Sequence, residues 1–149
     1  MCNVFDTAKY ILSEIGEVST MKLQKLCYYS LVEGLISPQQ VAIFNNKFEA
    51  WANGPVCRDL WNIHKGHFSI NKGMIPSHLL SKKKIPLSYK GYINLAIEKY
   101  GNMTGTKLSE LTHKEKPWRD LIGDVNSVNN SNRIITHKAI IDFYSSKQK

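Results

Sequence analysis

Residues 19–61 read STMKLQKLCYYSLVEGLISPQQVAIFNNKFEAWANGPVCRDLW, and the first half of this stretch decides the fold. Its small and apolar residues recur at the spacing of a single helix face, which comprises Leu23, Leu26, Cys27, Ser30, Leu31, Gly34 and Leu35. Met21, Tyr28 and Val32 widen this face. We therefore predict a central, largely buried helix that exposes only a narrow ridge of Lys22, Lys25, Tyr29 and Glu33.

Caps and chain breaks predict the elements on either side of this helix. Asp6 is placed to cap a first helix over residues 7–15, and Ser19 or Thr20 to cap the central one. Residues 41–44 and 47–52 predict two short strands joined at the tight turn of residues 45–46. Pro55 then suits the first position of a further helix, which Gly66 ends.

The second half of the chain is also predicted to be mainly helical. Residues 67–70 alternate weakly and favour a third short strand, whereas residues 76–86 have no period and predict a loop. Ser88 opens a helix that ends at Gly101, and caps at Thr106 and Thr136 open two more. The polar residues 123–132 predict an exposed loop.

Composition places the chain among globular proteins. Its 149 residues are 42% hydrophobic and 21% charged, and no run of about 18 apolar residues interrupts them. Three cysteines without a C-x-x-C pair argue against a disulfide framework, and the N-terminus lacks a secretory signal. We expect one cytoplasmic domain, residues 1–149, that is mainly α (α+β) with a small β-hairpin or three-stranded sheet beside the central helix.

The chain is basic. It contains 20 Lys and Arg against 12 Asp and Glu, which gives a net charge of +8 and a pI near 9.4. Such a field speeds encounter with acidic protein, nucleic acid or membrane surfaces without choosing among them. Lys82, Lys83 and Lys84 form a candidate basic patch, although such a run is more often a solvated loop.

The sequence offers little support for chemistry. Cys57, His64 and His67 are the nearest approach to a metal site, but their spacing matches no standard zinc pattern. Cys27 or Cys57 with His113 would need a catalytic signature that neither cysteine has. Phosphate-loop, dinucleotide-binding and hydrolase motifs do not occur. We expect no metal, no cofactor and no enzymatic activity.

Three short motifs occur in order along the chain. They read MKLQKLCYYSLVEGLI at 21–36, FEAWANGPV at 48–56 and LSELTHKEKPW at 108–118. Together they resemble the Panacea domain of SocA-like antitoxins, a family that includes phage-associated GepA-like proteins. The resemblance spans residues 6–144, is weakest over residues 67–85, and departs from the family pattern at Cys27, Ala52 and Asn53.

The resemblance implies an antitoxin that binds a cognate toxin protein and neutralises it, either by covering its active surface or by delivering it to a AAA+ protease such as ClpXP. The motif residues that it singles out are Leu23, Gln24, Lys25, Leu26, Glu49, Trp51, Gly54, Pro55, Val56, Thr112, His113, Pro117 and Trp118. Gln24 and Lys25 are the polar pair that a purely structural helix needs least, and contacts to the toxin are expected within residues 67–85.

Two alternatives stay open at this stage. The motif tryptophans Trp51 and Trp118 suit either a contact surface or the closure of the core. The rival function is that of a phage or mobile-element regulatory protein that binds nucleic acid, for which the run of residues 82–84 would be the phosphate contact. The sequence does not indicate the oligomeric state.

Overall fold

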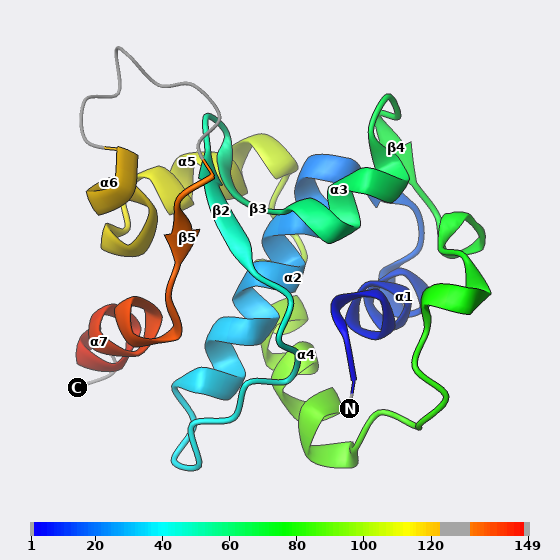
Figure 1. The fold of residues 1–149 in the computed structure, drawn as a ribbon, viewed down its shortest axis with the longest axis horizontal. Helices are drawn as coiled ribbons and strands as arrows, with labels where there is room; N and C mark the ends of the chain where they lie inside the picture. Colours follow the sequence, from blue (N-terminus) through cyan, green and yellow to red (C-terminus); the bar gives the residue numbers. More distant parts are fainter. Residues whose placement is uncertain (1, 123–131, 148–149) are drawn as a thin grey trace.

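The central helix α2 (Thr20–Leu35) passes through the middle of the molecule (Figure 1), in a computed structural model that describes residues 2–122 and 132–147. Ser19 caps it as predicted, because its Oγ accepts a hydrogen bond of 3.1 Å from the backbone N–H of Lys22. Helices α1, α4, α5 and α7 all contact α2. The described elements run in the order α1 (Val4–Ile15), β1 (Val18–Ser19), α2, β2 (Phe48–Trp51), β3 (Gly54–Cys57), α3 (Arg58–His64), β4 (Ser69–Ile70), the 3-10 turns η1 (Lys72–Met74) and η2 (Ser77–Leu79), α4 (Leu87–Tyr100), α5 (Gly105–His113), α6 (Lys116–Ile122), β5 (Ile134–Ile135) and α7 (His137–Lys147).

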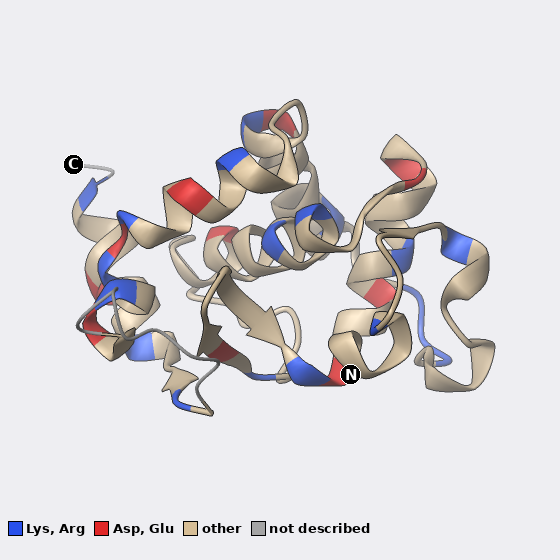
Figure 2. Cartoon of the chain, turned by 90° about the horizontal axis from the view of Figure 1, so that it is seen from above, with Lys and Arg blue, Asp and Glu red and all other residues tan. Residues whose placement is uncertain are grey.

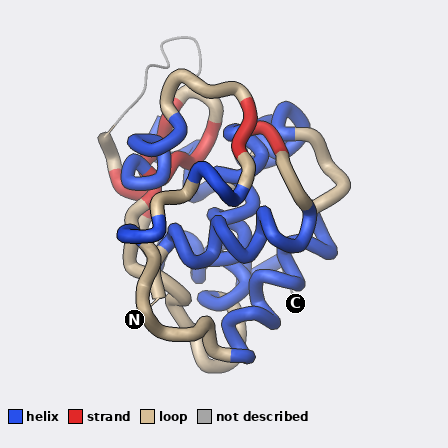
Figure 3. Tube along the Cα trace, turned by 90° about the vertical axis from the view of Figure 1, so that its right-hand side faces the viewer, coloured by secondary structure: helices blue, strands red, loops and turns tan. Residues whose placement is uncertain are grey.

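The strands form two small antiparallel groups, which lie in the upper half of the view in Figure 3, with most of the helices below them. One is a three-stranded sheet in the order β3–β2–β5, and the other pairs β1 with β4. The predicted fold class, mainly α with a small β element beside the central helix, is confirmed. The predicted strand at residues 67–70 exists as β4, but it pairs with the residues that precede α2 rather than with the hairpin.

The predicted solvent-exposed ridge of the central helix is wrong at three of its four positions. Lys25 is 1% exposed, Tyr29 0% and Glu33 5%. Helices α4 and α5 cover this side of α2, so that Tyr29 stacks on Tyr100 of α4 with ring centroids 4.0 Å apart. Helix α2 is therefore buried on nearly all sides, and its polar side chains have to find partners inside the protein.

The predicted hairpin is displaced along the chain. Residues 41–44 form no strand, because Val41 donates a backbone hydrogen bond of 2.8 Å to Gly34 and so ties this segment to the end of α2. The turn falls instead at residues 52–53, where Trp51 pairs with Gly54. Asn46, predicted to lie in the turn, accepts from the N–H of Val4 and so joins the hairpin approach to α1.

Several helix starts also differ from the prediction. Asn3 rather than Asp6 caps α1, and Asp6 completes a capping box by accepting from the Asn3 N–H. Thr104 rather than Thr106 caps α5. Pro55 does not open a helix, because it lies in β3, an edge strand on which its missing N–H breaks no ladder.

The remaining expectations concern loops, charge and membranes. Residues 76–86 form a loop that includes η2, and the exposed loop expected at residues 123–132 falls almost entirely outside the described residues. Lys and Arg are spread over most elements rather than gathered on a single one (Figure 2). Among the described residues, every helix is too short or too polar to cross a membrane.

Candidate functional site

A pocket of about 270 Å³ lies where the first turns of α2 meet the β2–β3 hairpin and α3. We call it the hairpin pocket; it is lined by Thr20, Met21, Gln24, Lys25, Trp51, Asn53, Val56, Trp61, His64, Lys65, Gly66 and His67. Four of these residues, Gln24, Lys25, Trp51 and Val56, are among the motif residues singled out individually in the sequence. The lining combines aromatic with basic side chains and, among the described residues, includes no carboxylate.

Lys25 is the buried cation of this pocket. Its Nζ donates a hydrogen bond of 3.0 Å to the carbonyl oxygen of Pro55. No carboxylate in the described part of the chain forms an ion pair with it. Because burial removes the water that would stabilise an ammonium group, the pKa of Lys25 falls to about 7. An ionisable group held in this way is a frequent mark of a functional site.

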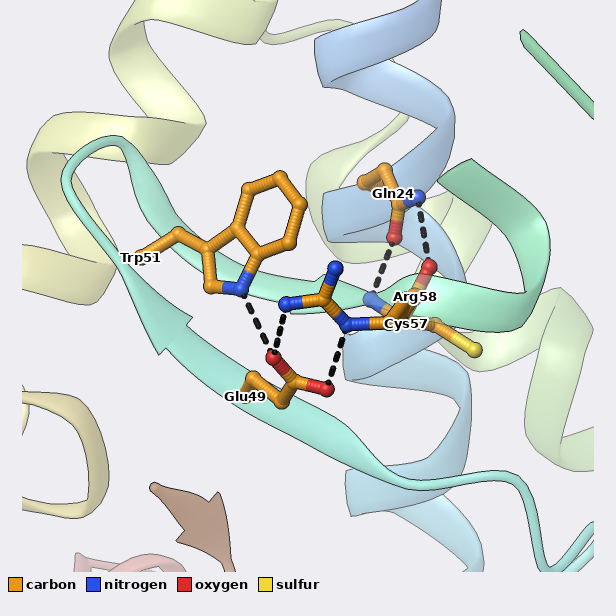
Figure 4. A network of polar contacts seen from close by, with 5 residues as sticks. All are labelled: Gln24, Glu49, Trp51, Cys57 and Arg58. Carbon is orange, nitrogen blue, oxygen red and sulfur yellow. Dashed lines mark hydrogen bonds and ion pairs between the residues drawn. The ribbon is translucent and has the colours of Figure 1, made fainter. Parts of the chain in front are cut away.

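Gln24 fixes the wall of the pocket formed by β3 and α3 (Figure 4). Its side-chain oxygen accepts from the N–H of Cys57 at 2.8 Å, and its Nε2 donates to the carbonyl of Cys57 at 3.1 Å. The same Nε2 lies 3.0 Å from His64 Nε2, so the imidazole accepts through that nitrogen. Burial lowers the pKa of His64, which favours this neutral form. Gln24 is thus a positioning residue.

Trp51 is oriented by the ion pair between Glu49 and Arg58 (Figure 4). Its indole N–H donates to Glu49 Oε1 at 3.1 Å, and the Arg58 guanidinium holds both oxygens of the same carboxylate at 2.9 and 3.1 Å. The guanidinium carbon also lies 5.1 Å from the Trp51 ring centroid. Hydrogen bonding from Arg58 lowers the pKa of Glu49, so the carboxylate stays charged and keeps the ring in place.

The rim of the hairpin pocket comes from α3 and the segment that follows it. Trp61 meets Trp51 edge to face, with ring centroids 5.3 Å apart, and Lys65 Nζ lies 5.4 Å from the Trp61 ring centroid. Next to the lining residue His67, the side chain of Phe68 is 86% exposed. A single exposed aromatic side chain is ordinary on a protein surface, but next to an aromatic and basic pocket it enlarges the area that a partner protein can contact.

The third motif does not line the pocket and instead supports the hairpin from behind. Trp118, 1% exposed, donates from its indole nitrogen to the carbonyl of Trp51 at 2.7 Å. His113 stacks on Trp118, with ring centroids 4.0 Å apart, and its buried Nε2 has no hydrogen-bond partner among the described residues. Burial lowers the pKa of His113. The interpretation of Trp118 as a core-closing residue is therefore the one that its position supports.

Gly54 and Thr112 fix the distance between the hairpin and α5. Gly54 has a φ of +112°, and a Cβ atom on it would lie 2.5 Å from Thr112 Oγ1 and 2.9 Å from Lys25 Cε. Only glycine combines this backbone conformation with so close an approach. The G-P-V motif therefore presses the hairpin against Lys25 and α5.

The structure separates the other predicted site residues from the hairpin pocket. Leu23 and Leu26 are fully buried core residues. Pro117 lines a separate pocket of about 460 Å³ beside α6 and α7. The exposed run of residues 82–84 lies elsewhere, where Lys83 and Lys84 meet Lys9 and Lys90 at one shallow depression.

Neither a metal site nor a reactive cysteine emerges from the arrangement. Within residues 2–122 and 132–147, no three His, Cys, Asp or Glu side chains come together as ligands. Burial raises the pKa of the Cys57 thiol to about 12 and raises that of Cys27 well above its usual value. Both thiols are therefore protonated at neutral pH and poorly nucleophilic.

Sequence reasoning singled out as site residues only four of the twelve residues that line the pocket. Trp61, His64 and Lys65 come from α3 and its C-cap, a helix that was predicted to begin at Pro55 and begins at Arg58, and Met21 was assigned to the apolar face of α2. The available signal was Trp61 itself, a large aromatic residue within the helix that was predicted between Pro55 and Gly66. Glu115 is buried and accepts hydrogen bonds from the hydroxyls of Tyr29 and Tyr144. The sequence gave no signal of this, because a glutamate between two lysines is typical of a solvent-exposed segment.

These features define a class: a mainly helical α+β domain with an aromatic and basic pocket at its hairpin. Over residues 23–119, which contain the motif residues from Leu23 to Trp118, the chain matches the family model described as antitoxin SocA-like, Panacea domain. The match covers more than half of the chain, and the chain belongs to this family. No curated protein and no solved structure matches it.

Proposed function

We propose that this chain is an antitoxin that neutralises a cognate toxin protein by binding it directly in the cytoplasm. The observation that carries the proposal is membership of the SocA-like Panacea family across all three motifs. Because the chain carries a net charge of +8, the proposal includes a toxin with an acidic face. Association with such a face is fast and sensitive to salt. The antitoxin itself performs no chemistry and needs no cofactor in this proposal.

The hairpin pocket and its rim are the proposed contact surface. They bring two tryptophans, an exposed phenylalanine and several basic groups together at one end of α2. Aromatic side chains ringed by positive charge suit recognition of a protein surface. His67 lines the pocket and the exposed Phe68 follows it in the chain, and these two residues begin the stretch of residues 67–85 where toxin contacts are expected.

Two routes to neutralisation are compatible with this surface. The antitoxin either covers the active surface of the toxin, or it holds the toxin while a AAA+ protease such as ClpXP degrades it. The first route needs only a stoichiometric complex. The second also needs the protease and lowers the amount of toxin in the cell.

The test is co-expression with the product of the adjacent gene, together with a binding measurement on the purified proteins at low salt. We expect growth to be rescued and a complex to form that weakens as salt is raised. Persistence of the rescue in cells that lack ClpXP separates occlusion from degradation. If the two proteins neither bind nor give rescue, the antitoxin proposal fails.

A matched pair of variants locates the contact surface. Phe68→Ala removes an aromatic residue, 86% exposed, next to the rim residue His67, and Leu87→Ala removes an aliphatic residue, 84% exposed, at the start of α4. Neither change disturbs the core, so both proteins fold normally. The proposal expects rescue to weaken with Phe68→Ala and to remain with Leu87→Ala.

Nucleic-acid binding is the second candidate, and the depression that gathers Lys83, Lys84, Lys9 and Lys90 favours it. Tyr10 lies there as well, with Lys90 Nζ 5.9 Å from its ring centroid. Binding to the upstream DNA would weaken steeply with salt and would be abolished by reversing the charges of residues 82–84. Rescue from the toxin without such binding would exclude this candidate as the source of neutralisation.

A further inference from the structure

We propose that the hairpin pocket receives an acidic side chain, Asp or Glu, that the partner protein presents beside an apolar residue, and that Lys25 is the group that pairs with it. The inference rests on the proposed function and goes beyond it, because it names the chemistry of the partner segment and the residue that recognises it.

Lys25 contrasts with the other buried charges. Glu33 is held by Lys99 at 3.0 Å, Glu49 by Arg58 at 2.9 Å, and Glu115 by the two tyrosine hydroxyls at 2.6 and 2.7 Å. Lys25, equally buried, uses one of its three N–H donors on the Pro55 carbonyl, and the described residues offer it no counter-ion. Burying an ammonium without a counter-ion costs free energy that a carboxylate would recover.

The surroundings of Lys25 belong to the hairpin pocket. The acceptor of Lys25, Pro55, stands in the chain between Asn53 and Val56, and both of these residues line the hairpin pocket together with Lys25 itself. Gly54 contributes no side chain, and a Cβ there would come within 2.9 Å of Lys25 Cε. Lys25 therefore belongs to the wall of the pocket although it is only 1% exposed, and a carboxylate that enters the pocket would approach its amine through the thin layer formed by the hairpin at Gly54.

The ionisable side chains around the hairpin pocket are basic rather than acidic. Lys65 and His67 are exposed at the rim, and His64 and His113 approach Lys25 closely enough to interact with it electrostatically. All of these groups are basic. Because burial lowers the pKa values of His64 and His113 and favours their neutral forms, the positive charge comes from Lys65 and from the protonated form of Lys25. With no acidic lining residue among those described, the potential in the pocket still favours an anionic group.

The last feature is the size and polarity of the hairpin pocket. A volume of about 270 Å³ falls just below the range of pockets for drug-sized ligands, about 300–1,000 Å³, and suits one or two amino-acid side chains. Met21, Val56, Trp51 and Trp61 supply an apolar wall beside the amine. The best fit is a carboxylate whose neighbour in the partner chain is apolar, and the side chain of Asp or Glu is the usual source of such a group.

The direct test uses blocked peptides and the full-length protein labelled with ¹³C at lysine Cε, with the Lys25 signal assigned by its loss in Lys25→Met. The probes are acetyl-Gly-Glu-Phe-Gly-amide, its Gln counterpart, and acetyl-Gly-Gln-Phe with a free C-terminal carboxylate. We expect the Glu peptide to shift the Lys25 signal and to bind at least tenfold more tightly than the Gln peptide. Lys25→Met should reduce its affinity to that of the Gln peptide, whereas Lys90→Met, in a different depression, should not.

Three outcomes overturn the inference. The Glu and Gln peptides bind equally, or neither moves the Lys25 signal; the Glu peptide keeps its affinity for Lys25→Met; or the free acid binds in place of the Glu peptide, which would assign the pocket to a chain terminus instead of a side chain. Folding of Lys25→Met is checked by its melting temperature, and Lys25→Gln serves as a second variant of similar length.

The partner arm separates this inference from the proposed function. If the wild-type chain neutralises the toxin and Lys25→Met loses at least tenfold in toxin affinity, both stand. If both chains neutralise equally well, the antitoxin proposal stands and the role of Lys25 is overturned. If the wild-type chain does not bind the toxin, the proposed function fails, and the peptide titration alone decides whether the pocket recognises a carboxylate.

Discussion

The two ends of α2 solve the same problem in different ways. Each buries a charged side chain, Lys25 near the start of the helix and Glu33 near its end, both at most 5% exposed. At the end of the helix, Glu33 receives two hydrogen bonds from Lys99, and the nearby Tyr29 donates to Glu115 at 2.6 Å. At its start, the one hydrogen-bond partner that the described residues give the Lys25 amine is a backbone carbonyl, that of Pro55.

The two ends differ in whether the buried charge finds its partner within the described part of the domain. The polar groups at the end of α2 complete one another, so they stabilise the domain whether or not a partner is present. The start of α2 leaves a cation without a counter-ion beside an aromatic pocket, an arrangement that lowers stability and that a partner would complete. Mutations at the end of α2 should therefore mainly lower stability, whereas mutations at its start should mainly weaken binding of the partner.

The largest expected effect is at the complete end. Glu115→Ala removes the shared acceptor of Tyr29 and Tyr144, so the buried Tyr29 hydroxyl loses its acceptor and Tyr144 keeps only the Tyr28 hydroxyl, 3.3 Å away; the change should cost about 3 kcal/mol of unfolding free energy. Urea denaturation measures it. Glu115→Gln keeps an acceptor at the same place and should cost about 1 kcal/mol. Equal losses for the two variants would show that the acceptor oxygen is not what matters.

The hairpin contact should come next. Gly54→Ala places a Cβ against Thr112 Oγ1 at a φ of +112° and should destabilise the fold by about 2 kcal/mol. Gly16→Ala is the matched control, because Gly16 also has a positive φ, +81°, but nothing within 4 Å of a Cβ there. We expect it to cost about 1 kcal/mol. If both variants lose the same amount, the close approach of the hairpin to α5 contributes nothing.

Removing one lysine at each end then tests the comparison directly. Lys99→Met leaves Glu33 buried without its cation and should cost about 1.5 kcal/mol, a value that allows for the partial exposure of Lys99. Lys25→Met removes a buried amine that has no counter-ion, and the gain offsets the lost hydrogen bond to Pro55, so its stability should stay within about 1 kcal/mol of wild type. Thermal or urea unfolding of both variants at pH 7 decides the point. A larger loss for Lys25→Met would mean that its role is mainly structural.

The smallest effect is a dependence on pH. Because the pKa of Lys25 is about 7 in the fold and near 10.5 in the unfolded chain, the unfolded state binds more protons between these values, and stability rises with pH there. Between pH 7 and pH 8 the gain should be about 1 kcal/mol. The gain is measured as the difference in unfolding free energy between the wild type and Lys25→Met at each pH, because the two proteins share all other titrating groups. Parallel pH curves for the two proteins would contradict a lowered pKa at Lys25.

Local signals explain what could be predicted. The apolar spacing of α2 and the cap at Ser19 lie within a few residues of one another, so they survive in any fold that buries this helix. The hairpin was misplaced because Asn45 and Asn46 resemble a turn as closely as the real one does. The real turn depends on Gly54 packing against Thr112, far along the chain.

The candidate site was predicted only in part, for a similar reason. Gln24, Lys25, Trp51 and Val56 were singled out, and they do line one pocket. Their roles were not predictable, since Gln24 turns out to bind the backbone of Cys57 and Lys25 to be buried instead of exposed. Both outcomes depend on how the hairpin meets α2, which no local pattern specifies.

By itself, the sequence determined the central helix, the mainly helical class and the three motifs that place the chain in the SocA-like Panacea family, because each rests on spacing within a short segment. Only the tertiary structure decided which charges are buried and which of them are paired. Lys25 meets Pro55 across 30 residues, and Tyr29 meets Glu115 across 86. Whether a charge is neutralised depends on such distant neighbours, so the unpaired cation that marks the proposed binding end of α2 appears only in three dimensions.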